Sequence, residues 1–122
     1  MREILFRGKR KLNKDWIIGS LHIEKFTDDE EYLCCEVCQC DVYPETVGQY
    51  TGLTDKNGKK IFEGDVVRWD GTEISQIRYC EGVYRLCNAD GYYGVSIHNH
   101  YSYVEVIGNI HDNPELMKGG AG

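Results

Sequence analysis

The fold of this chain is decided by the stretch Val42-Tyr-Pro-Glu-Thr-Val-Gly-Gln-Tyr-Thr-Gly-Leu-Thr-Asp-Lys-Asn-Gly-Lys-Lys-Ile-Phe-Glu-Gly-Asp-Val-Val67. It alternates apolar residues with residues that favour turns. Asp55-Lys-Asn-Gly58 predicts a hairpin, because Asn57 and Gly58 tolerate the positive φ angles that tight hairpins need. The stretch therefore predicts strands joined by short turns.

Two further turns lie in the same stretch. Glu63-Gly-Asp65 resembles the turn that opens a strand in many small SH3-like barrels, since Gly64 permits a tight bend and Asp65 can accept backbone donors. Pro44-Glu-Thr-Val47 predicts a short helical turn with proline at its first position. We interpret the remaining motif residues as packing or close-approach positions: Val47, Gly48, Tyr50, Gly52 and Leu53.

Short extended segments flank this stretch on both sides. Before it, residues 3–7 and 16–24 predict an opening hairpin around the polar loop 8–14, and residues 32–39 predict a third strand. After it come expected strands divided by Gly-containing turns, and then a short helical cap: 72–80, 83–87, 92–97, 103–110 and 112–117. This pattern predicts a mainly β fold, a small SH3-like barrel with additional N-terminal strands and a short C-terminal helical turn.

The length of 122 residues suits a single domain. We divide it into N-terminal strands (1–43), the motif region and barrel (44–118) and a frayed tail (119–122). The formal net charge is -6, but residues 1–14 carry +5 and the remainder carries -11. The basic start, with Lys9, Arg10 and Lys11, could contact nucleic acid locally or serve as a solvated loop that keeps a sheet edge from aggregating.

Targeting signals are not recognisable in the sequence. No apolar run approaches the roughly 20 residues of a bilayer span. The start has apolar residues before its charges, the reverse of a signal peptide. We therefore expect a cytoplasmic protein with no membrane partner.

The six cysteines include four in the run Cys34-Cys-Glu-Val-Cys-Gln-Cys40. Cys35 and Cys38 have a spacing common in zinc knuckles. In a strand, however, side chains alternate faces, and neither Gly nor Pro lies between 34 and 40 to make a turn. We favour reduced thiols that act as small apolar residues. If a metal site did form, its ligands would include Cys34, Cys35, Cys38 and Cys40.

No nucleophile beside a base and no phosphate-binding loop can be recognised, so the sequence predicts neither an enzyme nor a cofactor. The most suggestive side chains are tyrosines and histidines near the end of the chain. They could bind bases or a protein partner, or pack across strands. These residues are Tyr92, Tyr93, His98, His100, Tyr101 and Tyr103.

The motif resembles the YopX family of small proteins encoded by bacteriophages and prophages. The stretch Val106-Ile-Gly-Asn-Ile-His-Asp-Asn-Pro-Glu-Leu116 and the opening Leu5-Phe-Arg-Gly-Lys9, followed by Trp16 and Gly19, fit the same family. The resemblance implies a mainly β fold with an SH3-like barrel, association into homo-oligomers and the cytoplasm of a bacterial host. It supplies no catalytic residue.

The leading hypothesis is a non-enzymatic phage or prophage accessory protein that binds a macromolecule. A host or phage protein is favoured as partner, because the surface is mostly acidic and aromatic patches suit such a contact. The alternative is a nucleic-acid-binding small barrel that uses the basic start and the Tyr/His group. A zinc-binding protein that uses the Cys34 to Cys40 cluster ranks below both.

Overall fold

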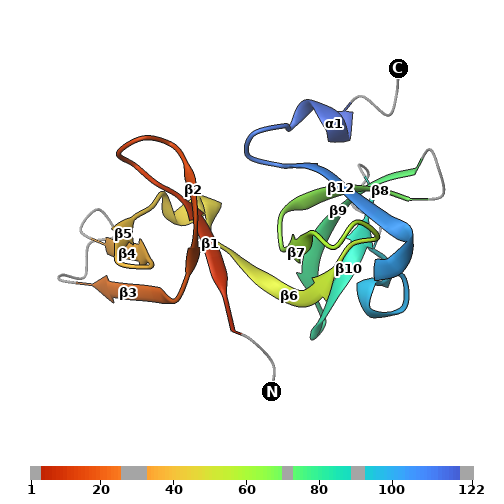
Figure 1. Cartoon of the computed structure of the whole chain (residues 1–122), viewed down its shortest axis with the longest axis horizontal. Coiled ribbons are helices and arrows are strands. Elements are labelled where there is room, and N and C mark those ends of the chain that lie inside the picture. Colours follow the sequence, from red (N-terminus) through yellow and green to blue (C-terminus); the bar gives the residue numbers. More distant parts are fainter. Residues whose placement is uncertain (1–3, 26–32, 70–72, 89–92, 119–122) are drawn as a thin grey trace. The chain divides into compact units, whose positions relative to one another are not determined.

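The structure is a computed structural model, and it describes residues 4–25, 33–69, 73–88 and 93–118. The chain divides into two compact units, Met1–Tyr50 and Thr51–Gly122 (Figure 1). Strand β6 (Gly48–Thr54) begins in the first unit and ends in the second. The tail predicted at 119–122 lies outside the described residues.

The first unit is built from short antiparallel strands. One group has the order β2-β1-β6 and the other the order β3-β4-β5. The 3-10 helix η2 (Pro44–Thr46) forms the predicted turn at Pro44. The strands of this unit before β6 are β1 (Phe6–Lys9), β2 (Trp16–Gly19), β3 (Leu21–Lys25), β4 (Leu33–Val37) and β5 (Cys40–Asp41).

The predicted opening hairpin is present, but its second strand is shorter than expected. The continuous strand predicted over 16–24 was wrong, because the chain breaks at Ser20 and changes partners: β2 pairs with β1, and β3 pairs with β4. The Ser20 carbonyl accepts a hydrogen bond from the Cys38 amide at 2.9 Å. The break therefore moves the chain from one sheet to the next.

The core of the first unit is small. Cys35, Val37 and Val42 are buried together, and four partly buried residues pack against them: Phe6, Ile17, Leu21 and Val47. At Gly8, an added Cβ would lie 2.9 Å from the Cβ of Val42. This close approach explains why strand β1 carries a glycine between larger residues.

The second unit contains a five-stranded antiparallel sheet with the order β11-β10-β9-β8-β12. Strand β10 (Val83–Cys87) has the predicted bounds. The other elements are β7 (Lys60–Phe62), β8 (Asp65–Trp69), β9 (Glu73–Cys80), β11 (Tyr93–Ser96), η3 (Ile97–Asn99), η4 (Tyr101–Tyr103), β12 (Val104–Asn109) and α1 (Glu115–Lys118).

The expected ends of two C-terminal elements shift for local reasons. Strand β11 ends before Ile97, because the Ser96 side chain accepts the His98 amide and caps η3. The helix predicted from residue 112 starts at Glu115. The Asn109 side chain accepts the amides of His111 at 3.0 Å and Asp112 at 2.9 Å, which holds that segment in a turn.

The prediction of a mainly β fold is confirmed. The described strands pair in open antiparallel sheets, and their pairing does not close a barrel. Among the described residues, no helix is long and apolar enough to cross a membrane.

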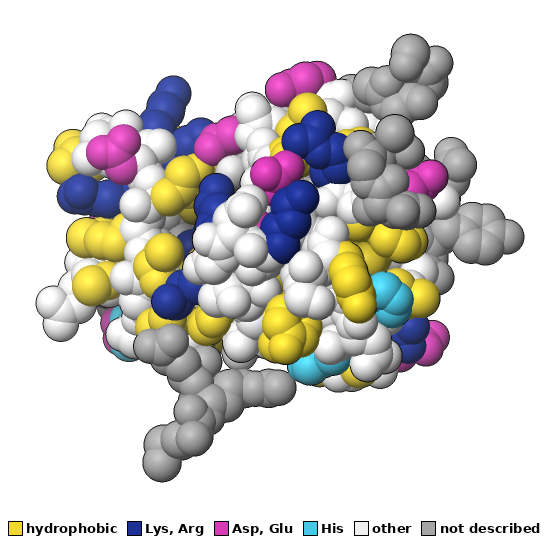
Figure 2. Space-filling view, turned by 45° about the vertical axis from the view of Figure 1, so that its right-hand side comes forward, with side chains coloured by type: hydrophobic (Ala, Val, Ile, Leu, Met, Phe, Trp, Pro, Cys, Tyr) yellow, Lys and Arg dark blue, Asp and Glu magenta, His cyan; other side chains and the backbone are white. Residues whose placement is uncertain are grey.

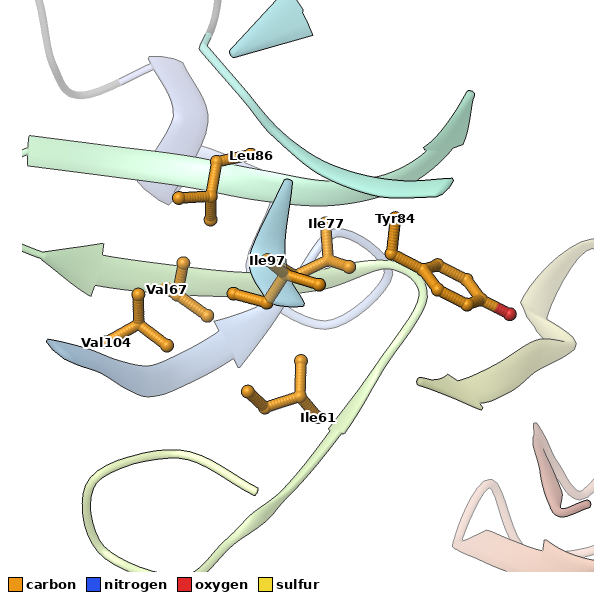
Figure 3. Packing of buried hydrophobic residues seen from close by; sticks show 7 residues of the cluster. All are labelled: Ile61, Val67, Ile77, Tyr84, Leu86, Ile97 and Val104. Carbon is orange, nitrogen blue, oxygen red and sulfur yellow. The ribbon is translucent and has the colours of Figure 1, made fainter. Parts of the chain in front are cut away.

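The core of the second unit is larger than that of the first. Figure 3 shows most of its side chains pointing toward one another, with the Tyr84 ring extending to one side. They come from β7, β8, β9, β10, η3 and β12. Leu53, Trp69 and Val106 pack against this cluster from its edges. The buried members are Ile61, Val67, Ile77, Tyr84, Leu86, Ile97 and Val104.

Two buried carboxylates shape the turns of this unit. Asp65 is 1% exposed, and its Oδ2 accepts the Phe62 amide at 2.7 Å across the turn in which Gly64 has φ 93°. Asp55 is 5% exposed, and its Oδ1 accepts the amides of Asn57 and Lys59, both at 2.9 Å. The predicted hairpin at 55–58 is therefore present, with the positive φ carried by Gly58.

Asp55 also reaches far along the chain. Its Oδ2 accepts the amide of Val106 at 2.9 Å, so one carboxylate ties the β6–β7 turn to strand β12. Burial raises the pKa of Asp55, but the three backbone hydrogen bonds and the charge of Lys59 outweigh it and leave the pKa below its ordinary value. The carboxylate therefore favours its ionised form, and its role is to hold the backbone in place.

Candidate functional site

The predicted Tyr/His group is assembled by two consecutive turns of 3-10 helix. His98 lies in η3, Tyr101 and Tyr103 lie in η4, and His100 joins the two. Ile97 anchors the segment, since it is 0% exposed within the core cluster. The His100 ring nitrogen Nδ1 lies 3.3 Å from the Ser96 carbonyl oxygen. A buried anchor thus holds polar and aromatic side chains at the surface.

Three rings of this region are in edge-to-face contact. The ring centroids of Trp69 and His100 are 6.4 Å apart, and those of His100 and Tyr103 are 6.5 Å apart. The Trp69 indole nitrogen donates to the Ser75 hydroxyl at 3.1 Å. We call Trp69, His100, Tyr101 and Tyr103 the aromatic surface.

The aromatic surface is open to solvent at its tyrosines. Tyr103 is 67% exposed and Tyr101 is 39% exposed. Figure 2 shows histidine side chains beside hydrophobic ones on one face of the molecule. Tyrosine and tryptophan bring large contact area with a hydrogen-bonding group, which is typical of protein interfaces.

Not every predicted member of the group can be placed. Tyr92 lies outside the described residues, and Tyr93 begins strand β11 with its side chain outside the described part. Trp69 was not predicted as a member. Its strand register, opposite Val104 at the end of β8, brings it to this surface, and that pairing is not visible in the local sequence.

The predicted basic residues belong to the first unit. Lys9 ends strand β1, Arg10 forms an isolated bridge with Val42, and Lys11 is exposed in the loop that follows. The aromatic surface belongs to the second unit. The basic start and the Tyr/His group are therefore features of different units.

The cysteine run turns back on itself, contrary to our expectation. Cys38 and Gln39 have φ angles of 52° and 66° and form the two-residue loop between β4 and β5. The absence of Gly and Pro between residues 34 and 40 predicts no turn, and that prediction was wrong. Cys35 is buried in the core cluster, whereas Cys38 is exposed.

The placed thiols do not gather into a site. Cys38, Cys40, Cys80 and Cys87 are free cysteines, and the side chain of Cys34 lies outside the described part. Within residues 4–25, 33–69, 73–88 and 93–118, no group of three or more His, Cys, Asp or Glu side chains is arranged to hold a metal ion. Burial raises the pKa of the Cys87 thiol and outweighs the nearby positive charge of Arg78, which lowers it. The raised pKa favours the neutral thiol.

Comparisons with known proteins give a family and a fold. A family model described as YopX protein matches residues 5–118. The crystal structure of protein EF1440 from Enterococcus faecalis is similar with a TM-score of 0.56 and 24% identity, over 96% of this chain and 99% of that chain. No curated protein matches the sequence.

Proposed function

The chain belongs to the YopX family, and we propose that it is a non-enzymatic accessory protein that binds another protein through the aromatic surface. The observation that supports this proposal is the contact chain of Trp69, His100 and Tyr103, which holds an exposed tyrosine in a defined orientation. A fixed aromatic side chain loses little conformational entropy on binding, so it suits an interface.

The same proposal includes the location, origin, domain organisation and oligomeric state of the protein. We place the protein in the cytoplasm of a bacterial host, encoded by a phage or prophage, with a host or phage protein as partner. A single domain over 1–122 is supported by the family match, which runs through both units. An SH3-like arrangement is supported by the meander of β8 to β11 with β12 beside β8. Association into homo-oligomers also belongs to this proposal.

The other two hypotheses have weaker support. A nucleic-acid-binding module that combines the basic start with the Tyr/His group draws on residues of different units. A zinc-binding protein would have to use Cys35, which is 5% exposed and packed among apolar side chains. The protein-binding proposal draws on the rings of Trp69, His100 and Tyr103, which are in contact within one unit.

The test is affinity capture from host cells in which the phage or prophage is active. The bait is the full chain, compared with Tyr101→Ser/Tyr103→Ser and with the control Tyr79→Ser. Tyr79 serves as the control, because it is 56% exposed in the same unit and its ring contacts Tyr84 on strand β10, outside the aromatic surface. Each recovered protein is then bound in purified form to the three baits.

We expect a protein that binds the wild type and Tyr79→Ser and loses at least about tenfold in affinity for the double variant, as for interface hot spots. Equal binding to all three baits would overturn the assignment of the surface. Recovery of nucleic acid alone, released by nuclease, would overturn the assignment of the partner. Size-exclusion chromatography with light scattering tests the homo-oligomer.

A further inference from the structure

The opening hairpin of the first unit has one basic and aromatic face. In its register, Arg7 pairs with Ile18 and Lys9 pairs with Trp16. Directly paired residues point to the same side of an antiparallel sheet, and so do residues two apart in a strand. These four side chains therefore share one face, which we call the hairpin face.

The cations of the hairpin face lie over the indole ring. The Arg7 guanidinium carbon is 4.9 Å from the centroid of the Trp16 ring, and the Lys9 ammonium nitrogen is 6.0 Å from it. Both distances are in the range of cation–π contacts. The fold thus holds two positive charges and one large planar ring side by side.

The opposite face of the same hairpin builds the core of the first unit. Phe6 and Ile17 pack against the buried cluster, and Gly8 meets Val42. The hairpin face is therefore directed away from this core. Ile18, one of its members, is 48% exposed.

Positive charge continues from the hairpin face into the loop. Lys11 and Lys14 are exposed, and the loop is shaped by backbone bonds from Arg10 to Asp15 and from Lys14 to Arg10. Residues 1–14 carry +5 in a chain whose remainder carries -11. Positive potential is therefore concentrated at this hairpin.

We propose that the hairpin face and its loop bind single-stranded nucleic acid, with phosphates at Lys9 and Lys11 and a base against Trp16. A polyanion is favoured by the local charge. Among polyanions, a nucleic acid also supplies flat rings that stack on the indole, whereas an acidic peptide would use the cations alone. A single strand is favoured over a duplex, because a base must be unstacked from its neighbours to reach a protein ring.

The binding test uses the full chain and labelled oligothymidine, oligouridine and a duplex of equal length, measured by fluorescence anisotropy over a series of salt concentrations. The variant is Lys9→Gln/Lys11→Gln. The control is Lys56→Gln/Lys60→Gln, which removes the same charge from exposed lysines of the second unit. The logarithm of the binding constant falls with the logarithm of the salt concentration. For a single strand, loss of two phosphate contacts makes this slope less steep by about 1.4.

We expect single strands to bind in low salt, Lys9→Gln/Lys11→Gln to lose about tenfold or more in affinity, and the control to bind within about twofold of the wild type. Stacking predicts that a single strand quenches tryptophan emission and that Trp16→Phe loses most of this quenching. The circular dichroism melt of each variant shows whether it is folded.

Several results would overturn the proposal. These are no binding in low salt, equal affinity for the duplex, or equal loss in the control variant. Complete displacement by polyglutamate at equal charge, without quenching, would indicate an acidic protein as partner instead. Tyr101→Ser/Tyr103→Ser is expected to bind single strands like the wild type. The nucleic-acid proposal and the protein-partner proposal can therefore be refuted independently of each other.

Discussion

The first and second units fix their turns in different ways. In the second unit, the carboxylates of Asp55 and Asp65 are buried and accept backbone amides across their turns. In the first unit, the hairpin turn at Cys38–Gln39 has two non-glycine residues with positive φ, and Gly8 and Gly19 provide the close approaches. One unit relies on buried charge, and the other on backbone geometry and small residues.

This difference has consequences for stability. A buried carboxylate that satisfies several amides leaves those donors unpaired when it is removed, which costs about 1–3 kcal/mol for each buried donor. A left-handed conformation costs a non-glycine residue about 1–2 kcal/mol, and a side chain added at a tight glycine contact costs about 1–3 kcal/mol. The second unit should therefore be more sensitive to single polar substitutions, and the first to changes in residue size and φ.

The two units can be observed separately, because the chain has two tryptophans, Trp16 in the first unit and Trp69 in the second. Incorporated fluorotryptophan gives one fluorine NMR signal for each unit. Denaturant titrations followed at these two signals then report the stability of each unit.

The largest expected effect is that of Asp55→Ala. It removes three hydrogen bonds of 2.9 Å from the amides of Asn57, Lys59 and Val106. We expect the second unit to lose about 3 kcal/mol or more, because charged acceptors contribute about 1.5–3 kcal/mol each. The fluorine signal of Trp69 should shift to the unfolded position at lower denaturant than that of Trp16.

The conservative control is Asp55→Asn, which keeps one acceptor oxygen and should lose less than the alanine variant. Equal stability of Asp55→Ala and the wild type would show that the carboxylate does not hold the turn. Equal destabilisation at both tryptophans would show that the two units unfold together. Their stabilities could then not be compared separately.

A smaller effect is expected for Gly8→Ala in the first unit. The added Cβ would lie 2.9 Å from Cβ, Cγ1 and Cγ2 of Val42, which is 0% exposed. Overpacking of this kind costs about 1–3 kcal/mol. The denaturation midpoint at the Trp16 signal should fall.

Val42→Ala tests whether this contact is the cause. It removes the methyl groups that meet the new Cβ, so Gly8→Ala/Val42→Ala should be less destabilised than the sum of the two single variants. Additive losses would indicate that the cost of Gly8→Ala arises elsewhere in strand β1.

Acid should remove the stabilisation that the Asp55 carboxylate gives to the second unit. The folded pKa of Asp55 lies below the ordinary value of 3.8, so its stabilisation is present above that pH and is lost as the pH falls through the folded pKa. The stability gap between the wild type and Asp55→Asn, measured at Trp69, should narrow as the pH falls below about 4. A constant gap from neutral to acid pH would contradict the lowered pKa.

The sequence predicted what is local and missed what is long-range. The turns at 55–58 and 63–65 and the bounds of β10 follow from Gly, Asn and Asp at short spacing. The bond from Asp55 to Val106 joins residues 51 positions apart, and the contact of Trp69 with His100 depends on strand register. Neither leaves a periodic or compositional signal in one sequence.

The Cys38–Gln39 turn was missed for a different reason. Sequence rules identify such turns by Gly or Asn, and this turn uses neither. The strain of two left-handed residues is offset by their surroundings. Cys38 donates its amide to the Ser20 carbonyl at 2.9 Å, and Val37, directly before the turn, is 0% exposed. Tertiary packing thus overrides local preference at this point.

The smallest predicted effect compares this turn with its counterpart in the second unit. Glu81 and Gly82, with φ angles of 53° and 84°, form the two-residue loop between β9 and β10. Gln39, with φ 66°, occupies the position that Gly82 occupies there. Both hairpins thus need a left-handed residue at the second loop position, but only one has glycine.

Exchanging these residues should change the stability of the two units in opposite directions. Gln39→Gly is expected to stabilise the first unit and Gly82→Gln to destabilise the second, each by about 1 kcal/mol, because a left-handed conformation costs a non-glycine residue about 1–2 kcal/mol and glycine loses part of that gain to chain entropy. A Cβ added at Gly82 meets no atom within 4 Å, so its effect isolates the backbone. If Gln39→Gly instead lowers the midpoint at Trp16, the Gln39 side chain stabilises the turn by more than its φ angle costs.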